Sequence, residues 1–228
     1  MGKNDNGNNG RTELVFVVDR SGSMGGLESD TIGGFNSMLS KQRTIAGECR
    51  VTTLLFDHRI ETLHNHLDIR EVNDLTSRDY WVRGSTALLD AIGLAIDRMI
   101  VTQRHTAAAY RAQHVLFVII TDGYENASRR YSLHQIKQMI TYERERYHWE
   151  FEFLGANIDA EQTAGDFGIS PRCATDFHAD GQGIKASFEA VACAATAVRG
   201  GADLDDLSAP DFLGGVRDDY RSRRRMKR

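Results

Sequence analysis

The sequence has little cysteine, no long apolar run and no excess of positive charge, and each absence excludes a class of protein. Its three cysteines, Cys49, Cys173 and Cys193, are odd in number and form no C-x-x-C pair, so a disulfide scaffold is not expected. No segment approaches the roughly 18 consecutive apolar residues of a membrane span. The formal net charge of −4 argues against a general nucleic-acid binder.

The two ends of the chain are polar. Residues 1–11 are rich in glycine and asparagine and lack the apolar core of a secretory signal peptide, so we expect a disordered segment and a cytoplasmic protein. Residues 203–228 change from acidic to basic, and we expect them to form a solvated tail. Contact of this tail with an acidic partner or a nucleic acid is the alternative. Residues 12–202 are long enough for one α/β domain with a full core.

One segment combines a buried strand with metal-ligand chemistry. The apolar run Leu14–Val18 predicts a buried strand, and Asp19-Arg20-Ser21-Gly22-Ser23 follows it directly. Ligands in open α/β sheets bind outside the carboxyl ends of the strands. One carboxylate and two hydroxyls at that place form a set of hard oxygen ligands, which suits Mg²⁺ or Mn²⁺.

Two further segments repeat this design. Thr86 lies in a glycine-containing loop just before a helical pattern, and Asp122 follows the apolar run Val115–Ile120 and Thr121. A bland alternative is that Ser21 and Ser23 only cap the next helix. That alternative does not explain why a second buried strand also ends in an aspartate.

Strand and helix patterns alternate along the chain. Apolar or alternating runs predict strands over residues 13–19, 49–56, 59–67, 115–121, 149–157 and 172–177. Helical spacing predicts helices around residues 32–39, 88–100, 133–147, 159–167 and 181–199, the third starting with a capping box at residues 132–135. Such alternation favours parallel βαβ units. We predict an α/β fold: a doubly wound, mostly parallel sheet with the first strand central, residues 59–67 as one antiparallel edge strand, and helices on both faces.

His64 and His66 lie in the predicted edge strand. Their spacing would place both side chains on one face of a regular strand, where they could bind a metal. No third ligand is evident nearby, so a solvated edge is the favoured interpretation.

The order Asp-x-Ser-x-Ser, then Thr, then Asp resembles the metal-ion-dependent adhesion site (MIDAS) of the von Willebrand factor A (VWA) family, whose fold is Rossmann-like. All five ligand positions match, namely Asp19, Ser21, Ser23, Thr86 and Asp122. The resemblance covers about residues 13–200. Phrases such as Gly84-Ser85-Thr86-Ala87-Leu88-Leu89-Asp90 and Phe153-Leu154-Gly155-Ala156-Asn157 are similar to small stand-alone bacterial or phage members.

The resemblance implies a metal-dependent protein–protein interaction module. In the family the ion keeps one coordination position for an acidic group of a partner protein, here in an expected stress-response, chaperone or signalling assembly. We expect no catalytic residue, no membrane contact, and no nucleic-acid contact outside the basic tail. The alternative is a Mg²⁺-dependent phosphohydrolase with an aspartate nucleophile. That chemistry usually needs a second carboxylate two residues after the nucleophile, where this chain has Ser21.

Two expectations concern surfaces. Arg20, Met24, Tyr80, Trp81 and Tyr124 adjoin the ligand segments, and residues of these types at the rim of the site would favour a protein partner. Packing of Tyr80 and Trp81 against their own loop is equally consistent with the sequence. The helix at residues 181–199 is dense in alanine, which predicts shallow ridges that permit sliding, and a static helix is the alternative.

Overall fold

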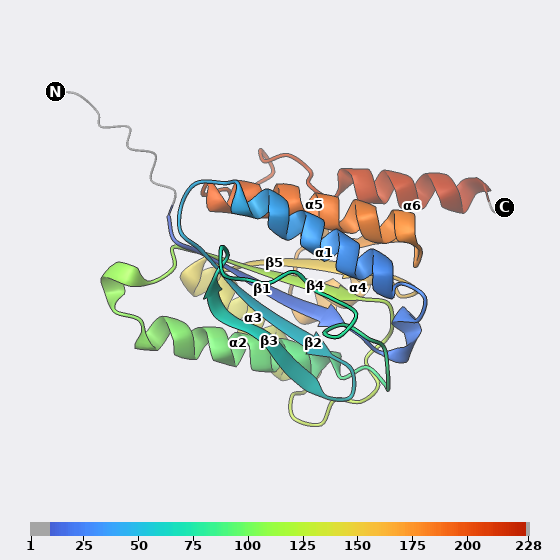
Figure 1. Cartoon of the computed structure of the whole chain (residues 1–228), viewed down its shortest axis with the longest axis horizontal. Helices are drawn as coiled ribbons and strands as arrows, with labels where there is room; N and C mark the ends of the chain where they lie inside the picture. The colour runs from blue at the N-terminus through green and yellow to red at the C-terminus, as the bar shows by residue number, and fades with distance from the viewer. Residues whose placement is uncertain (1–9, 227–228) are drawn as a thin grey trace.

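The computed structural model describes residues 10–226 as a twisted sheet between two layers of helices (Figure 1). The strands are β1 (Thr12–Asp19), β2 (Cys49–Phe56), β3 (Ile60–Asp68), β4 (His114–Thr121), β5 (Glu150–Gly155) and β6 (Ala174–Asp176). The helices are α1 (Glu28–Arg43), α2 (Leu88–His105), α3 (Leu133–Tyr147), α4 (Ala160–Phe167), α5 (Gly181–Arg199) and α6 (Gly214–Met226). Within these residues, no helix is both long and apolar enough to cross a membrane.

The sheet has the order β3-β2-β1-β4-β5-β6, which places β1 in the middle. The pair β2–β3 is antiparallel, and all other neighbouring strands are parallel. This arrangement confirms the predicted doubly wound α/β fold with one antiparallel edge strand.

The central strands are buried on both faces. Every residue of β1 is buried, because α1 and α5 cover one face of the sheet and α2 and α3 cover the other (Figure 1). Strands in this position are continuous apolar runs, and β4 follows the same rule after His114. The first polar residues after these runs therefore lie at the carboxyl edge of the sheet.

The strand register aligns the two aspartate segments. Val18 of β1 pairs with Ile120 of β4, so Asp19 and Thr121 end their strands at the same level. On its other side, Asp19 pairs with Phe56 at the end of β2. The loops that follow β1, β2 and β4 thus begin side by side.

The predicted start of α3 is confirmed in detail. The Ser132 hydroxyl accepts a hydrogen bond from the backbone N–H of Gln135, and the Gln135 side chain accepts one from the N–H of Ser132. This reciprocal pair satisfies two N–H groups that the first helical turn would otherwise leave unpaired.

The two histidines of β3 do not form a joint site. The register of β3 shifts between Val51 and Leu54 of β2, and His66 has a left-handed backbone with φ of 54°. His64 Nδ1 lies 3.0 Å from Thr53 Oγ1, whereas His66 Nδ1 lies 2.6 Å from Glu13 Oε1. The irregular strand breaks the two-residue alternation on which a shared face depends.

Both terminal segments, predicted to be disordered or solvated, include ordered residues. Residues 1–9 lie outside the described part of the chain, but Arg11 donates to Glu48 Oε2 at 2.7 Å and to the carbonyl of Ala109. The prediction of a solvated C-terminal tail is wrong, because residues 214–226 form α6, which lies along α5 (Figure 1). The physical reason is apolar burial, since Leu204, Leu213 and Val216 are all buried in the core.

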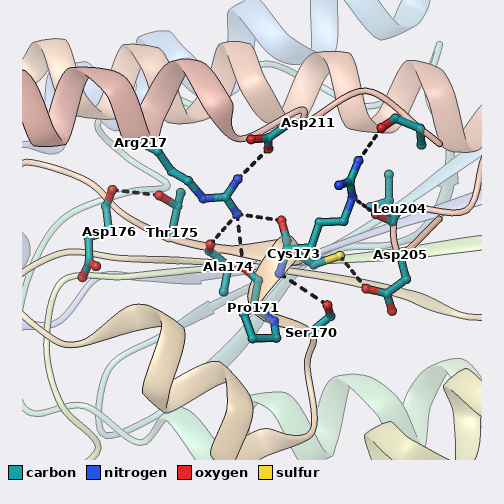
Figure 2. Close-up of polar contacts among 12 residues, drawn as sticks. Ser170, Pro171, Cys173, Ala174, Thr175, Asp176, Leu204, Asp205, Asp211 and Arg217 are labelled. Atoms are coloured by element: carbon teal, nitrogen blue, oxygen red, sulfur yellow. Dashed lines mark hydrogen bonds and ion pairs between the residues drawn. The ribbon is translucent and has the colours of Figure 1, made fainter. Parts of the chain in front are cut away.

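Arginine side chains fix α6 to the domain. Figure 2 shows Arg217 of α6 reaching Pro171 and Ala174 at the start of β6. The Arg217 guanidinium donates to the carbonyls of Pro171, Arg172 and Ala174 at 2.8–3.1 Å. Arg223 forms an ion pair with Asp180, the N-cap residue of α5. Two arginines of the basic C-terminal segment, Arg217 and Arg223, therefore stabilise the packing of α6 on the domain.

The packing of α5 is less smooth than its alanine content predicts. Phe188 occupies the space beside Gly34 of α1, where an added Cβ would lie 2.4 Å from the ring. At the C-terminal end of α5, buried Arg199 donates to the carbonyls of Gln42, in the last turn of α1, and of Ile45, just after that helix. These interlocking contacts oppose sliding and favour the static alternative.

Candidate metal centre

Asp19 ends β1 as a fully buried carboxylate. Its Oδ1 accepts the backbone N–H of Ser21 at 2.6 Å, and its Oδ2 accepts the hydroxyl of Thr121 at 2.6 Å. Burial raises the pKa of Asp19, and the Thr121 hydrogen bond opposes that rise. The carboxylate is therefore held in one orientation by the two central strands.

Ser21 and Ser23 place their hydroxyls together. The two Oγ atoms lie 3.0 Å apart, Ser21 just before and Ser23 within the turn Gly22–Met24 that follows β1. Ser21 caps that turn only by position, because its side chain makes no capping hydrogen bond, and the N-cap of α1 is Leu27. The capping alternative is therefore wrong for both serines.

Thr86 reaches the same place from the loop before α2. An added Cβ at Gly123 would lie 3.3 Å from Ser23 Oγ and 3.6 Å from Thr86 Oγ1, so both hydroxyls approach the residue next to Asp122. The Thr86 N–H donates to Asn126 Oδ1 at 2.9 Å, and the Thr86 carbonyl accepts the N–H of Asn126 at 3.0 Å. The loop after β4 thus holds Thr86 in position.

Asp122 is a buried carboxylate without a partner. Neither of its oxygens accepts a hydrogen bond from the described residues in good geometry. The pKa of Asp122 is raised to about 6 in total. Burial is the main cause, the nearby Ser23 hydroxyl opposes it, and the charge of Asp19 adds to it. No basic side chain of residues 10–226 forms an ion pair with Asp19 or Asp122. A buried, unpaired anion is costly unless a cation compensates it.

The donor set fits a hard divalent cation. Two carboxylates and three hydroxyls supply only oxygen, the element that Mg²⁺ and Mn²⁺ prefer. Among the residues described, no group of three or more histidine, cysteine, aspartate or glutamate side chains could hold a metal. An ion at this site would therefore have two carboxylate ligands, from Asp19 and Asp122, and three hydroxyl ligands, from Ser21, Ser23 and Thr86.

Sequence reasoning missed the residues that support the ligands. Tyr80 is buried, and its hydroxyl donates to the Asp19 carbonyl at 2.6 Å. Buried Asp57, in the turn after β2, accepts Arg20 Nε at 3.2 Å and Arg83 Nε at 2.7 Å. It therefore ties the loop of Ser21 to the loop of Thr86. The only signal in the sequence is that Arg20 and Arg83 each lie beside a ligand segment.

The prediction that Arg20, Met24 and Tyr80 lie on the exposed rim of the site is wrong. Arg20, Met24 and Tyr80 are all buried, and the Arg20 guanidinium pairs with Asp57 and Glu61. Trp81 and Tyr124 remain exposed, with 42% and 62% of their surfaces accessible. The Trp81 ring lies under the Arg83 guanidinium, 4.3 Å from it, so part of its surface packs on its own loop.

Comparison with known proteins adds evidence on the fold. No protein-family model and no curated protein sequence matches the chain. The structure of proximal thread matrix protein 1 from the mussel byssus, with a zinc-occupied MIDAS motif, is similar with a TM-score of 0.57 and 14% identity over 82% of this chain. The chain spans 46% of that protein.

Two further solved structures are similar. Manganese-loaded TRAP protein of Plasmodium vivax gives a TM-score of 0.51 with 15% identity, covering 78% of this chain and 72% of TRAP. The VWA domain of SpRpn10 gives 0.52 with 12% identity, covering 79% of this chain and 94% of that domain. At such identities the likeness shows a shared VWA fold and no more.

Proposed function

Because the chain has the fold of VWA domains, we propose that it is a metal-dependent interaction module whose ion binds an acidic residue of a partner protein. The ligands are Asp19, Ser21, Ser23, Thr86 and Asp122, and the ion is Mg²⁺ or Mn²⁺. The setting that we propose is a cytoplasmic stress-response, chaperone or signalling assembly of the bacterial or phage type. The observation that carries the proposal is the buried, unpartnered carboxylate of Asp122 beside Asp19.

A donor set without excess negative charge explains the choice of an acidic partner. Hydroxyl ligands are neutral, so two carboxylates would only balance the charge of a divalent ion. Mg²⁺ prefers six oxygen ligands and usually keeps water in some positions. A glutamate or aspartate of the partner can replace such a water and gain a direct bond to the metal. The metal sites in the mussel and Plasmodium structures support a divalent ion in this fold.

The surroundings of Asp19 favour binding over phosphoryl transfer. Both oxygens of Asp19 accept hydrogen bonds, from Ser21 and Thr121, which lowers the nucleophilicity of the carboxylate. The position two residues after Asp19 carries a serine and no acid. We therefore propose a non-enzymatic role.

Calorimetric titration of the metal-free chain with Mn²⁺ and Mg²⁺ tests the metal site. We expect one ion per chain and loss of binding in Asp122→Asn. Glu145→Gln, an exposed carboxylate change on α3, is the matched control and should bind normally. Equal binding by Asp122→Asn would contradict the proposed ligand set.

Capture of partners on the immobilised chain tests the role of the ion. Partners retained in Mg²⁺ should be released by chelator and should not bind to Thr86→Ala. A partner retained equally in chelator and by Thr86→Ala would show that recognition lies elsewhere on the domain.

A further inference from the structure

A groove lies directly beside the candidate metal centre. It runs between the first turns of α2 and α3 and the length of α4, and its volume is about 460 Å³. Its walls are mainly apolar, formed by Leu88, Leu89, Leu133, Ile158 and Phe167. Leu133 is 43% exposed at the mouth of this groove, although it is a large aliphatic residue in the first turn of a helix. The wall therefore offers apolar surface to an incoming side chain.

The groove and the metal ligands share a wall. Gly123 lines the groove, and it also approaches the hydroxyls of Ser23 and Thr86, at 3.3 and 3.6 Å from the position of an added Cβ. Tyr124, the next residue, lines the groove and is largely exposed. Successive residues of an extended peptide are about 3.3 Å apart. A peptide with an acidic residue at the ion can therefore place a side chain one to three positions away in the groove.

The outer rim of the groove is acidic. Asp159, the N-cap residue of α4, and Asp166 near the end of α4 both line it and are exposed. Glu125 also lines it, but its carboxylate already accepts N–H groups of Leu89 and Ala127. Of the described residues in its wall, none is basic. Asp159 accepts the N–H of Gln162, but neither Asp159 nor Asp166 forms an ion pair with a described residue, so the rim charge favours a basic group on the occupant.

We infer that this groove receives a large apolar side chain of the same partner segment that supplies the acid to the ion. The segment carries the acid, then leucine, isoleucine, methionine or phenylalanine within three residues, then lysine or arginine facing Asp159 and Asp166. This inference rests on the proposed function and adds the chemistry of the partner. Apolar anchors in a pocket carry much of the affinity of such contacts.

Selection from a displayed library of random peptides tests this composition. The full-length chain is immobilised in Mg²⁺, and bound peptides are eluted with chelator. We expect enriched peptides to contain the acid, the apolar residue and the basic residue in this spacing. In the best peptide, replacing the apolar residue with alanine should weaken binding measured by fluorescence anisotropy at least tenfold.

Variants of the chain locate the contact. Leu133→Glu should weaken that peptide at least tenfold and leave Mn²⁺ binding unchanged, since glutamate is tolerated in the first turn of a helix. Val101→Glu, which replaces a side chain of α2 that is 54% exposed, is the matched control and should change neither. Asp159→Asn with Asp166→Asn should weaken the peptide and reduce the salt dependence of its binding.

The possible results separate the two proposals. Peptides that elute with chelator and carry the acid, but show no apolar preference and bind Leu133→Glu normally, would overturn the groove and leave the proposed function intact. Enrichment of peptides that chelator does not release, or of none at all, would overturn both. Conversion of a dimer to a monomer by Leu133→Glu, measured by sedimentation, would show a second copy in the groove and also refute the inference.

Discussion

Replacement of Asp122 by asparagine should have opposite effects with and without metal. In the metal-free chain, Asp122 is a buried carboxylate that no described residue pairs, and its pKa is raised to about 6. At pH 7.5 the carboxyl group is charged, so burial of that charge lowers the free energy of unfolding. The amide of asparagine has nearly the same shape without the charge.

The magnitude follows from the pKa. The difference between about 3.8 and about 6 corresponds to about 3 kcal/mol of destabilisation above pH 6. Access of water to the rim of the site reduces this, so we expect Asp122→Asn to stabilise the metal-free chain by about 1–3 kcal/mol. For a chain of this size, that raises Tm by about 2–10 °C.

Bound metal should make the wild-type chain more stable than Asp122→Asn. An ion at a thousandfold excess over its Kd stabilises the wild-type chain by about 4.1 kcal/mol, which exceeds the gain from the substitution, and it should have little effect on Asp122→Asn. Urea denaturation at pH 7.5, in chelator and in saturating Mn²⁺, measures all four free energies of unfolding. The reasoning is refuted if Asp122→Asn is less stable than wild type in chelator, or if Mn²⁺ stabilises both proteins equally.

Four further predictions concern metal binding, the C-terminal helix, a buried glutamate and the absence of phosphatase activity. Thr86→Ala should raise the Kd for Mn²⁺ at least tenfold in calorimetry, while Ser85→Ala, an exposed neighbour, should not change it. Arg217→Ala should lower the free energy of unfolding in urea by about 3 kcal/mol, because three carbonyls lose a charged donor, whereas exposed Arg221→Ala should cost under about 0.5 kcal/mol. Burial raises the pKa of Glu152 to about 8, so the folded chain binds a proton there that the unfolded chain has released above about pH 4.5. Wild-type stability should therefore fall relative to Glu152→Gln as pH rises from 4.5 to 8, by up to about 5 kcal/mol, and an unchanged difference between urea melts at pH 5 and pH 8.5 would contradict this. The chain with Mg²⁺ should not hydrolyse p-nitrophenyl phosphate, and turnover that Asp19→Asn abolishes would instead support the phosphohydrolase alternative.

The C-terminal segment shows where sequence reasoning fails. The basic run after Arg217 is typical of a solvated tail, but Leu213 and Val216 are spaced to bury on one face of a short helix. A segment with many charged residues and only two apolar ones has a local pattern that predicts a solvated tail. Besides this apolar burial, other parts of the chain stabilise the helix by supplying carbonyls at Pro171–Ala174 and the carboxylate of Asp180. Those acceptors are 40 or more residues away and have no local signature.

The expected rim fails for a related reason. Arg20 and Tyr80 belong to residue types common at interfaces, yet both are buried beneath the loop. Asp57 and the Asp19 carbonyl receive their polar groups. Residue type gives a preference for the surface, but only the position of a distant partner decides whether a polar group can be buried.

The sequence by itself determined a doubly wound sheet with β1 central and one antiparallel edge strand, the buried strands β1 and β4, and the polar residues that follow them. These features depend on local periodicity and on the rule that parallel strands end at one edge of the sheet. Only the tertiary structure decided that both Asp122 oxygens lack a partner, that Asp57 joins two ligand loops, and that a groove adjoins Gly123. Each of these depends on distances between loops far apart in the chain, which local preferences do not encode.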